Sequence, residues 1–127
     1  MSKMQYYNPK TTAPPGGHYS HVVVANGMAY ISGQLPITAA GQQLNSASFE
    51  DQAKQVLINL QAALEAANSS IENLVQVRVY ITNINYWPLF NTIYAQWADA
   101  ALPARAVVPV PELHHGFLIE IEALALV

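Results

Sequence analysis

Two short apolar segments lie on either side of the dipeptide Asn26-Gly27. The first reads YSHVVVA from Tyr19 to Ala25, and the second reads MAYISGQ from Met28 to Gln34. Asn-Gly is the dipeptide best suited to the positive φ angles of a two-residue hairpin turn, so the pattern predicts that these segments pair as antiparallel strands. Gly33 is expected to break or bulge the second strand.

A long amphipathic helix is predicted after this hairpin. The sequence SFED at residues 48–51 offers a serine that can cap a helix and two acidic residues in its first turn, where they interact favourably with the helix dipole. Apolar residues then recur at steps of three and four over about five turns, and the NSS sequence at residues 68–70 is expected to end the helix. The apolar positions are Phe49, Ala53, Val56, Leu57, Leu60, Leu64 and Ala67.

The second half of the chain predicts three strands and a shorter helix. The sequence LVQVRVYIT from residue 74 alternates, and the side expected to pack against helices holds Val75, Val77, Val79 and Ile81. Pro88 suits the first turn of a helix whose apolar stripe is Phe90, Ile93, Tyr94 and Trp97. The last two strands are predicted over Ala104–Val110 and Phe117–Leu126.

These elements follow in the order β-β-α-β-α-β-β, after an arm at residues 1–18 that is rich in Pro, Thr and Gly and is expected to be irregular. Because two long amphipathic helices must cover a sheet, residues 1–127 are predicted to form one two-layer α+β domain with both helices on one face of a mixed β-sheet. The opposite face carries carboxylates among leucines, a mixture that suits a subunit interface with a polar pocket. On the last strand this face holds Leu118, Glu120, Glu122, Leu124 and Leu126.

The composition also favours an assembly of subunits. Hydrophobic residues make up 52% of the 127 residues and charged residues only 10%, which is too little charge to cover a lone small globule. Five scattered Lys and Arg residues and a net charge of −3 give no basic stripe, so nucleic acid is not expected as a partner. The lack of cysteine excludes disulfides and thiolate chemistry. No signal-peptide pattern and no membrane-spanning run is found, so a cytoplasmic protein without a membrane partner is expected.

Charged residues within apolar strands are the candidate functional groups. Arg105 lies inside LPARAVVPV, where its planar fork suits bidentate binding of a small carboxylate and where an internal ion pair is the alternative. Glu120 and Glu122 share one strand face, a spacing that offers a general base and a neighbour able to tune it. The alternative for them is that one or both pair with Arg78 or Arg105 across the sheet.

The remaining polar residues give weaker signals. His18 and His21 are separated by two residues. His114 and His115 are adjacent and would point to opposite sides of a strand, which is a poor spacing for chelation, so no metal site is predicted. Ser32 precedes a flexible glycine, but without a GxSxG sequence a hydrogen-bonding role is favoured over a nucleophilic one.

Taken in order, several segments resemble the RidA/YjgF family of small enamine and imine deaminases over about residues 7–127. They are YSHVV, AYISGQLPI, FEDQAKQVLINLQAALEAAN, LVQVRVYITNI, FNTIYAQW, LPARAVV and LIEIEALA. The resemblance implies a chorismate-mutase-like α+β fold and a homotrimer with three pockets at the subunit interfaces. It also implies hydrolysis of 2-enamine or 2-imine carboxylates to 2-oxo acids and ammonia, with no cofactor and no metal.

The resemblance assigns roles to individual residues as well. Arg105, in the family's Pro-Ala-Arg motif, matches the arginine that grips the substrate carboxylate. Glu120 matches the glutamate that helps to position or activate water. The other matching substrate contacts are Tyr19, Ser32, Gly33 and Asn91.

Some positions depart from the family pattern. Many members follow the arginine with Ser or Thr and then Cys or Thr, whereas this chain has Ala106 and Val107, so Val107 is expected to give the substrate pocket an apolar wall. His114-His115 change the loop before the last strand. The competing interpretation is a non-enzymatic trimer that binds a small carboxylate metabolite as a sensor. Glu120 separates the two, because a binding module would gain little from a second anion near its ligand.

Overall fold

The computed structural model describes residues 3–127, so the first two residues of the expected arm lie outside the described part. The strands are β1 (Gln5–Tyr7), β2 (Val22–Ala25), β3 (Met28–Gln34), β4 (Leu74–Ile81), β5 (Ala104–Pro109) and β6 (Ile119–Leu126). The helices are α1 (Phe49–Ala66) and α2 (Trp87–Ala98), and three short 3₁₀ turns are η1 (Ile71–Asn73), η2 (Ile84–Tyr86) and η3 (His114–Gly116).

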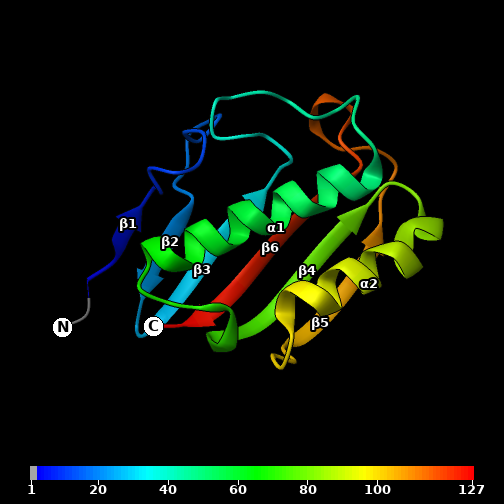
Figure 1. Ribbon diagram of the computed structural model, residues 1–127. Coiled ribbons are helices and arrows are strands. Elements are labelled where there is room, and N and C mark those ends of the chain that lie inside the picture. The colour runs from blue at the N-terminus through cyan, green and yellow to red at the C-terminus, as the bar shows by residue number, and fades with distance from the viewer. Residues whose placement is uncertain (1–2) are drawn as a thin grey trace.

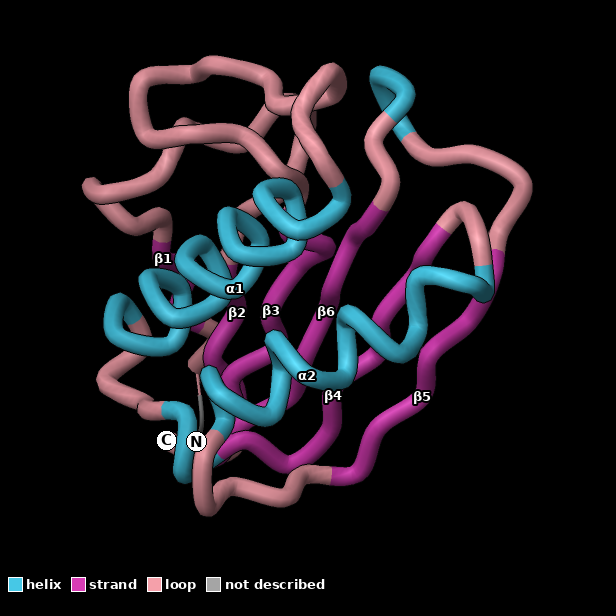
Figure 2. Tube along the Cα trace, turned by 45° about the vertical axis from the view of Figure 1, so that its right-hand side comes forward, coloured by secondary structure: helices cyan, strands magenta, loops and turns pink. Residues whose placement is uncertain are grey.

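The six strands of the described residues form one mixed sheet in the order β1-β2-β3-β6-β4-β5. Neighbouring strands are antiparallel except β4 and β5, which pair in parallel and are connected through α2. Both helices lie on the same face of the sheet (Figure 1), with α1 packed on β3 and β6, while Figure 2 shows α2 running across β4 and β5. The predicted two-layer α+β fold with a mixed sheet is confirmed.

The structure confirms the sequence signals for the hairpin turn, the start of α1 and the bulge at Gly33. Asn26 and Gly27 have φ angles of 52° and 75°, and they connect β2 to β3 as an antiparallel hairpin. The Ser48 side chain accepts a hydrogen bond from the Asp51 N–H at the start of α1. The register between β3 and β6 shifts between Ile31 and Gln34, which is the bulge predicted at Gly33.

The expected irregular arm and the expected start of the first hairpin strand were both partly wrong. Residues Gln5–Tyr7 form β1, which pairs with β2 at the edge of the sheet. β2 begins at Val22 rather than Tyr19. Upstream of it the chain turns, because the Tyr19 N–H donates to the Gly17 carbonyl at 3.0 Å. Pairing with a distant strand, rather than local composition, decides both boundaries.

The predicted orientation of Val75 is wrong. Leu74 is buried instead, and Val75 is 41% exposed, because the pairing of β4 with β6 shifts register between Leu74 and Gln76. A bulge of this kind inserts one residue and moves the preceding residues to the opposite face. The alternation is regular from Gln76 onward, with Val77, Val79 and Ile81 buried.

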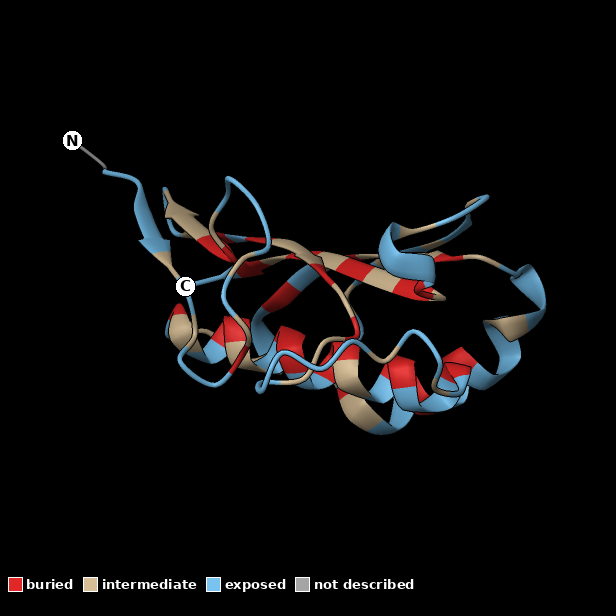
Figure 3. Ribbon diagram, turned by 90° about the horizontal axis from the view of Figure 1, so that it is seen from above, coloured by how far each residue is buried: buried red, intermediate tan, exposed pale blue. Residues whose placement is uncertain are grey.

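The hydrophobic core lies between the helices and the sheet, and the other sheet face is left uncovered (Figure 3). The uncovered face carries the expected mixture, since Leu118, Glu120, Glu122 and Leu124 are all partly exposed on β6 or just before it. Tyr30 on β3 is 47% exposed and pairs with Leu124 on that face. Among residues 3–127, the helices are too short or too polar to cross a membrane.

Candidate active site

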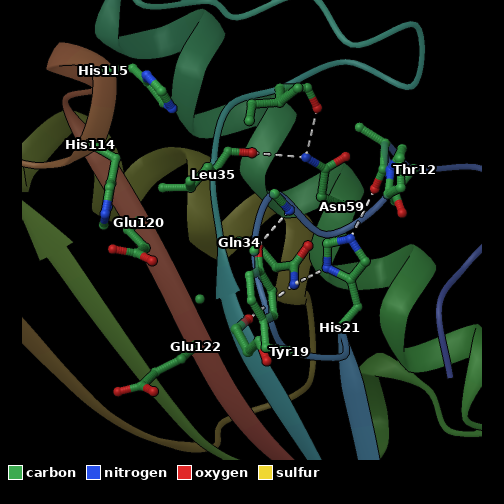
Figure 4. A pocket seen from close by; sticks show the side chains of 17 residues that line it. Thr12, Tyr19, His21, Gln34, Leu35, Asn59, His114, His115, Glu120 and Glu122 are labelled. Carbon is green, nitrogen blue, oxygen red and sulfur yellow. Dashed lines mark hydrogen bonds between the residues drawn. The ribbon is translucent and has the colours of Figure 1, made fainter. Parts of the chain in front are cut away.

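A cavity of about 570 Å³ opens where the N-terminal arm, the end of β3 and the start of β6 meet (Figure 4). Its walls come from residues 12–21 of the arm, residues 32–37, Asn59 of α1, and residues 114–122 of η3 and β6. These segments are distant in sequence and meet because β3 and β6 are neighbours in the sheet. Four of the predicted site residues line this cavity: Tyr19, Ser32, Gly33 and Glu120.

Glu120 lies near the start of β6, half-buried on the face that no helix covers. Within residues 3–127 its carboxylate has neither a hydrogen bond nor an ion pair. Burial raises the pKa of the Glu120 carboxyl, His114 opposes that rise, and the charge of Glu122 adds to it. A carboxylate with a raised pKa and free lone pairs on a cavity wall is suited to accept a proton from water.

Glu122 has a different environment, although it lies only two residues away. Its Oε1 accepts a hydrogen bond from the Tyr80 hydroxyl at 2.5 Å and lies 3.7 Å from Nη1 of Arg78. The negative charge of Glu122 in turn raises the pKa of the Tyr80 hydroxyl, mainly through that hydrogen bond. The ion-pair alternative is therefore confirmed for Glu122, and the two carboxylates are not equivalent.

Gly33 allows the close approach between β3 and Glu120. A Cβ atom at Gly33 would lie 2.8 Å from Cδ of Glu120 and nearer still to one carboxylate oxygen. A side chain at this position would therefore overlap the carboxylate where it now lies. The Ser32 hydroxyl donates to the Ser20 carbonyl at 2.6 Å, so it ties the arm to β3.

A hydrogen-bond network of buried polar side chains in the cavity wall was not predicted. Nε2 of His21 is 2.9 Å from the Ala13 carbonyl, to which it donates, and Nδ1 then accepts from the Gln34 side chain at 3.2 Å. The Asn59 amide donates to the Leu35 and Ile37 carbonyls at 2.9 and 3.0 Å. The network fixes the arm and the loop after β3 to the core. Helical spacing could have indicated Asn59, which lies three residues after Val56, a position on the apolar face.

The other predicted site residues, Arg105, Asn91 and Val107, form a second group elsewhere on the molecule. Arg105 is on the edge strand β5, and its Nη1 donates to Oδ1 of Asn91 on α2 at 3.0 Å. Its guanidinium lies 4.9 Å from the centre of the Tyr94 ring, close enough for a cation–π contact. Val107 lies two residues further along the same strand face. Together Asn91 and Tyr94 hold one fixed orientation of the Arg105 fork.

Within one chain, Arg105 and Glu120 lie on opposite faces of the sheet. Arg105 pairs in register with the buried Val77, which faces the helices, whereas Glu120 pairs with Tyr80 on the uncovered face. The predicted alternative of an ion pair between Glu120 and Arg105 across the sheet is therefore wrong within the chain. Within one chain, the residues that the resemblance assigns to one site therefore lie in two separate places.

Residues 10–127 match the protein family described as Endoribonuclease L-PSP. This chain belongs to that family, also called YjgF/RidA. Among its relatives, the L-PSP family member of Homo sapiens named 2-iminobutanoate/2-iminopropanoate deaminase is 38% identical over 118 residues, which cover 91% of this chain and 86% of that protein. Protein HMF1 of Saccharomyces cerevisiae is 38% identical over 107 residues, covering 84% and 82%.

Solved L-PSP family structures share the whole fold. A Rid family protein of Yersinia pestis, YyfA, superposes with a TM-score of 0.94 at 35% identity and covers 98% of this chain and 100% of its own. Escherichia coli TdcF, solved with bound serine, gives a TM-score of 0.90 at 29% identity and covers 97% and 98%. L-PSP family relatives carry different names, including a regulator, AldR, of Lactococcus lactis at 35% identity over 86% of both chains.

Proposed function

We propose that the protein hydrolyses reactive 2-imino and 2-enamine carboxylates to 2-oxo acids and ammonia, in pockets completed by neighbouring protomers of a homotrimer. The observation that carries this proposal is Glu120, a half-buried carboxylate on the wall of a cavity that has no ion pair within residues 3–127. The relatives named 2-iminobutanoate/2-iminopropanoate deaminase support the same class of reaction.

The chemistry needs a carboxylate anchor and a base. Arg105 binds the substrate carboxylate through the guanidinium N–H groups that Asn91 leaves free. An enamine first takes a proton at its β-carbon and becomes the iminium, whose C2 is already electrophilic. Glu120 then accepts a proton from water as the water oxygen bonds to C2. Glu120 returns this proton to the amine nitrogen of the carbinolamine. The C–N bond then breaks as the C2 hydroxyl gives its proton to Glu120, which releases ammonia and leaves the 2-oxo acid.

A second protomer is proposed because the two groups face different ways in one chain. An interface that joins the β5 edge of one protomer to the uncovered sheet face of the next is heterologous, and such an interface forms a ring when the rotation between protomers closes. Three is the number of subunits that the family resemblance implies. The low content of charged residues and the partly exposed Tyr30, Leu124 and Leu126 on the uncovered face agree with burial against another protomer.

We predict that the protein in solution has three times the mass of its 13.8 kDa chain. Light scattering coupled to size exclusion at micromolar concentration measures this mass. A monomer would contradict the composite pocket, since Arg105 and Glu120 then have no means of meeting.

The function is tested directly by ammonia release from freshly generated imines of several amino acids, with and without the protein. Faster release than the spontaneous rate supports the deaminase. Binding of 2-oxo acids without any acceleration would favour the sensor interpretation, for which TdcF with bound serine and the regulator name of AldR are the supporting observations. RNA cleavage, which the family description suggests, is a control assay; the five scattered cations give it little support.

Gly33→Ala is expected to lower kcat by roughly tenfold to a hundredfold, because displacement of a catalytic group by about 1 Å is costly. The fold should survive, since the group in the way is the end of the flexible Glu120 side chain and Gly33 has no positive φ. Thermal unfolding and kcat are measured together. A wild-type kcat in the folded Gly33→Ala variant would show that the carboxylate position does not matter.

A further inference from the structure

His114 is held beside Glu120 by the turn that precedes β6. His115 and Gly116 have φ angles of 57° and 74°, and the His114 carbonyl accepts a hydrogen bond from the Phe117 N–H at 3.0 Å. Phe117 is fully buried, so the backbone of His114 is tied to the core. The His114 side chain itself is exposed at the cavity and has no hydrogen-bond partner within residues 3–127.

His114 and Glu120 form walls of the same space. Both line the cavity of about 570 Å³, and both also line an adjoining hollow of about 530 Å³ between η3 and β6. Figure 4 shows the His114 imidazole directed toward the Glu120 carboxylate. The neighbouring His115 is arranged differently, because its ring packs edge-on against Phe117 with ring centres 5.6 Å apart.

His21 and Arg78 also lie near the cavity, but both are bound to other groups and cannot take the place of His114 beside Glu120. Both ring nitrogens of His21 are already hydrogen-bonded, and Arg78 is paired with Glu122. The titratable and charged groups around the two hollows are Glu112, His115, Glu120, Glu122, Tyr19, His21 and, through Glu122, Arg78 and Tyr80. In the proposed trimer, the partner subunit's Arg105 joins them, with the substrate carboxylate as its counter-ion.

We propose that His114 is a positioning residue that acts through Glu120: its imidazole lies on the same cavity wall and is directed toward the Glu120 carboxylate, where its positive charge favours the ionised form of that carboxylate. His114 is indeed the group that opposes the effect of burial on the pKa of Glu120. Histidine is charged on the acid side of neutrality, which is where this help is needed. The proposal rests on the proposed deaminase function, because Glu120 must be ionised to accept the proton of water.

The sign of the expected effect follows from this arrangement. Without the imidazolium the pKa of Glu120 rises further, so Glu120 loses its charge at a higher pH as the solution is acidified. The acid limb of kcat/KM therefore moves to higher pH in His114→Asn, while the rate at alkaline pH is retained. On the acid limb the loss should be roughly two- to fivefold, the size expected for one partly exposed charge pair.

The experiment compares kcat/KM against pH for the wild type, His114→Asn, His114→Lys and His18→Asn. His114→Lys restores a cation and should return the acid limb to the wild-type position or below it. His18→Asn is the matched control, because it also removes one exposed histidine, but His18 lines neither hollow; its acid limb should not move.

Three results are distinguishable. A limb that moves in His114→Asn and returns in His114→Lys supports the proposal. An unmoved limb, or an equal loss at every pH, overturns it and leaves the deaminase intact. Absence of turnover in the wild type overturns the proposed function instead. In that case NMR titration of the Glu120 carboxyl carbon, in the wild type and in His114→Asn, still decides whether His114 acts on this group, since an unchanged titration refutes it.

Discussion

Glu120→Gln is expected to lower kcat for imine hydrolysis by about 10² to 10⁴, the usual effect of removing a positioned general base. Glutamine keeps the size of the side chain but cannot accept a proton from water. Because Glu120 has no ion pair or hydrogen bond within residues 3–127, the substitution breaks no interaction that stabilises the fold. Affinity for a 2-oxo acid, measured by calorimetry, should be retained or improved, since a nearby negative charge is removed.

The matched control is Glu122→Gln on the same strand face. Glu122 accepts the Tyr80 hydroxyl and pairs with Arg78, so its loss should lower kcat far less than the loss of Glu120. If Glu120→Gln keeps the full rate, the protein remains a deaminase but Glu120 is not its base. If the wild type gives no turnover while both variants bind 2-oxo acids, the sensor interpretation replaces the deaminase.

Arg105→Lys is expected to lower kcat/KM by roughly ten- to a hundredfold, which corresponds to about 1.5 to 3 kcal/mol for a charge-assisted hydrogen bond. The charge is kept, but an ammonium cannot form the two parallel contacts of a guanidinium. Lysine also loses the planar contact with the Tyr94 ring and the geometry that Asn91 holds. Steady-state kinetics on the folded variant measure the change, and near-wild-type values would refute the role as carboxylate anchor.

Mixing the two variants tests whether one site uses two protomers. In trimers reassembled from equal amounts of Arg105→Lys and Glu120→Gln chains, a site at each interface has both native groups in about one case in four if assembly is random. Mixed trimers should therefore recover roughly a quarter of the wild-type activity, although each parent is impaired. Each variant reassembled alone is the control. If samples shown to have exchanged subunits recover no activity, Arg105 and Glu120 do not act together across an interface. Either both then belong to a site within one chain, or one of them takes no part in the reaction.

Much of the fold could be predicted because its signals are local. The Asn26-Gly27 turn depends on the φ preferences of two residues, and the start of α1 depends on a single capping serine. The boundaries that failed depend on distant partners. β1 exists because β2 offers it a free edge, and Val75 faces outward because β4 must fit the register of β6.

In the candidate site, too, the sequence indicated some features and could not distinguish others. The sequence indicated Glu120 and Arg105 as unusual charges within strands, and it placed Glu120 and Glu122 on one face by their spacing of two. It could not distinguish the two carboxylates. Only the structure shows that Tyr80 and Arg78 bind Glu122, whereas no side chain in the described part of the chain pairs with Glu120. That difference depends on which side chains the neighbouring strand brings opposite each carboxylate.

By itself, the sequence determined the helices, most strands and the hairpin turn, since periodicity and backbone preference act over a few neighbouring residues, and it indicated the candidate reactive groups. The tertiary structure decided how those groups are combined. The alternation of apolar and polar residues assigns each residue to one of the two sides of its own strand. It does not say which side of one strand lies on the same sheet face as a given side of another strand. The register of β4 with β5 and β6 places Arg105 toward the helices and Glu120 on the uncovered face, and the turn at His115 and Gly116 brings His114 to Glu120. These relations arise from pairings between residues far apart in the chain, and no local pattern encodes them.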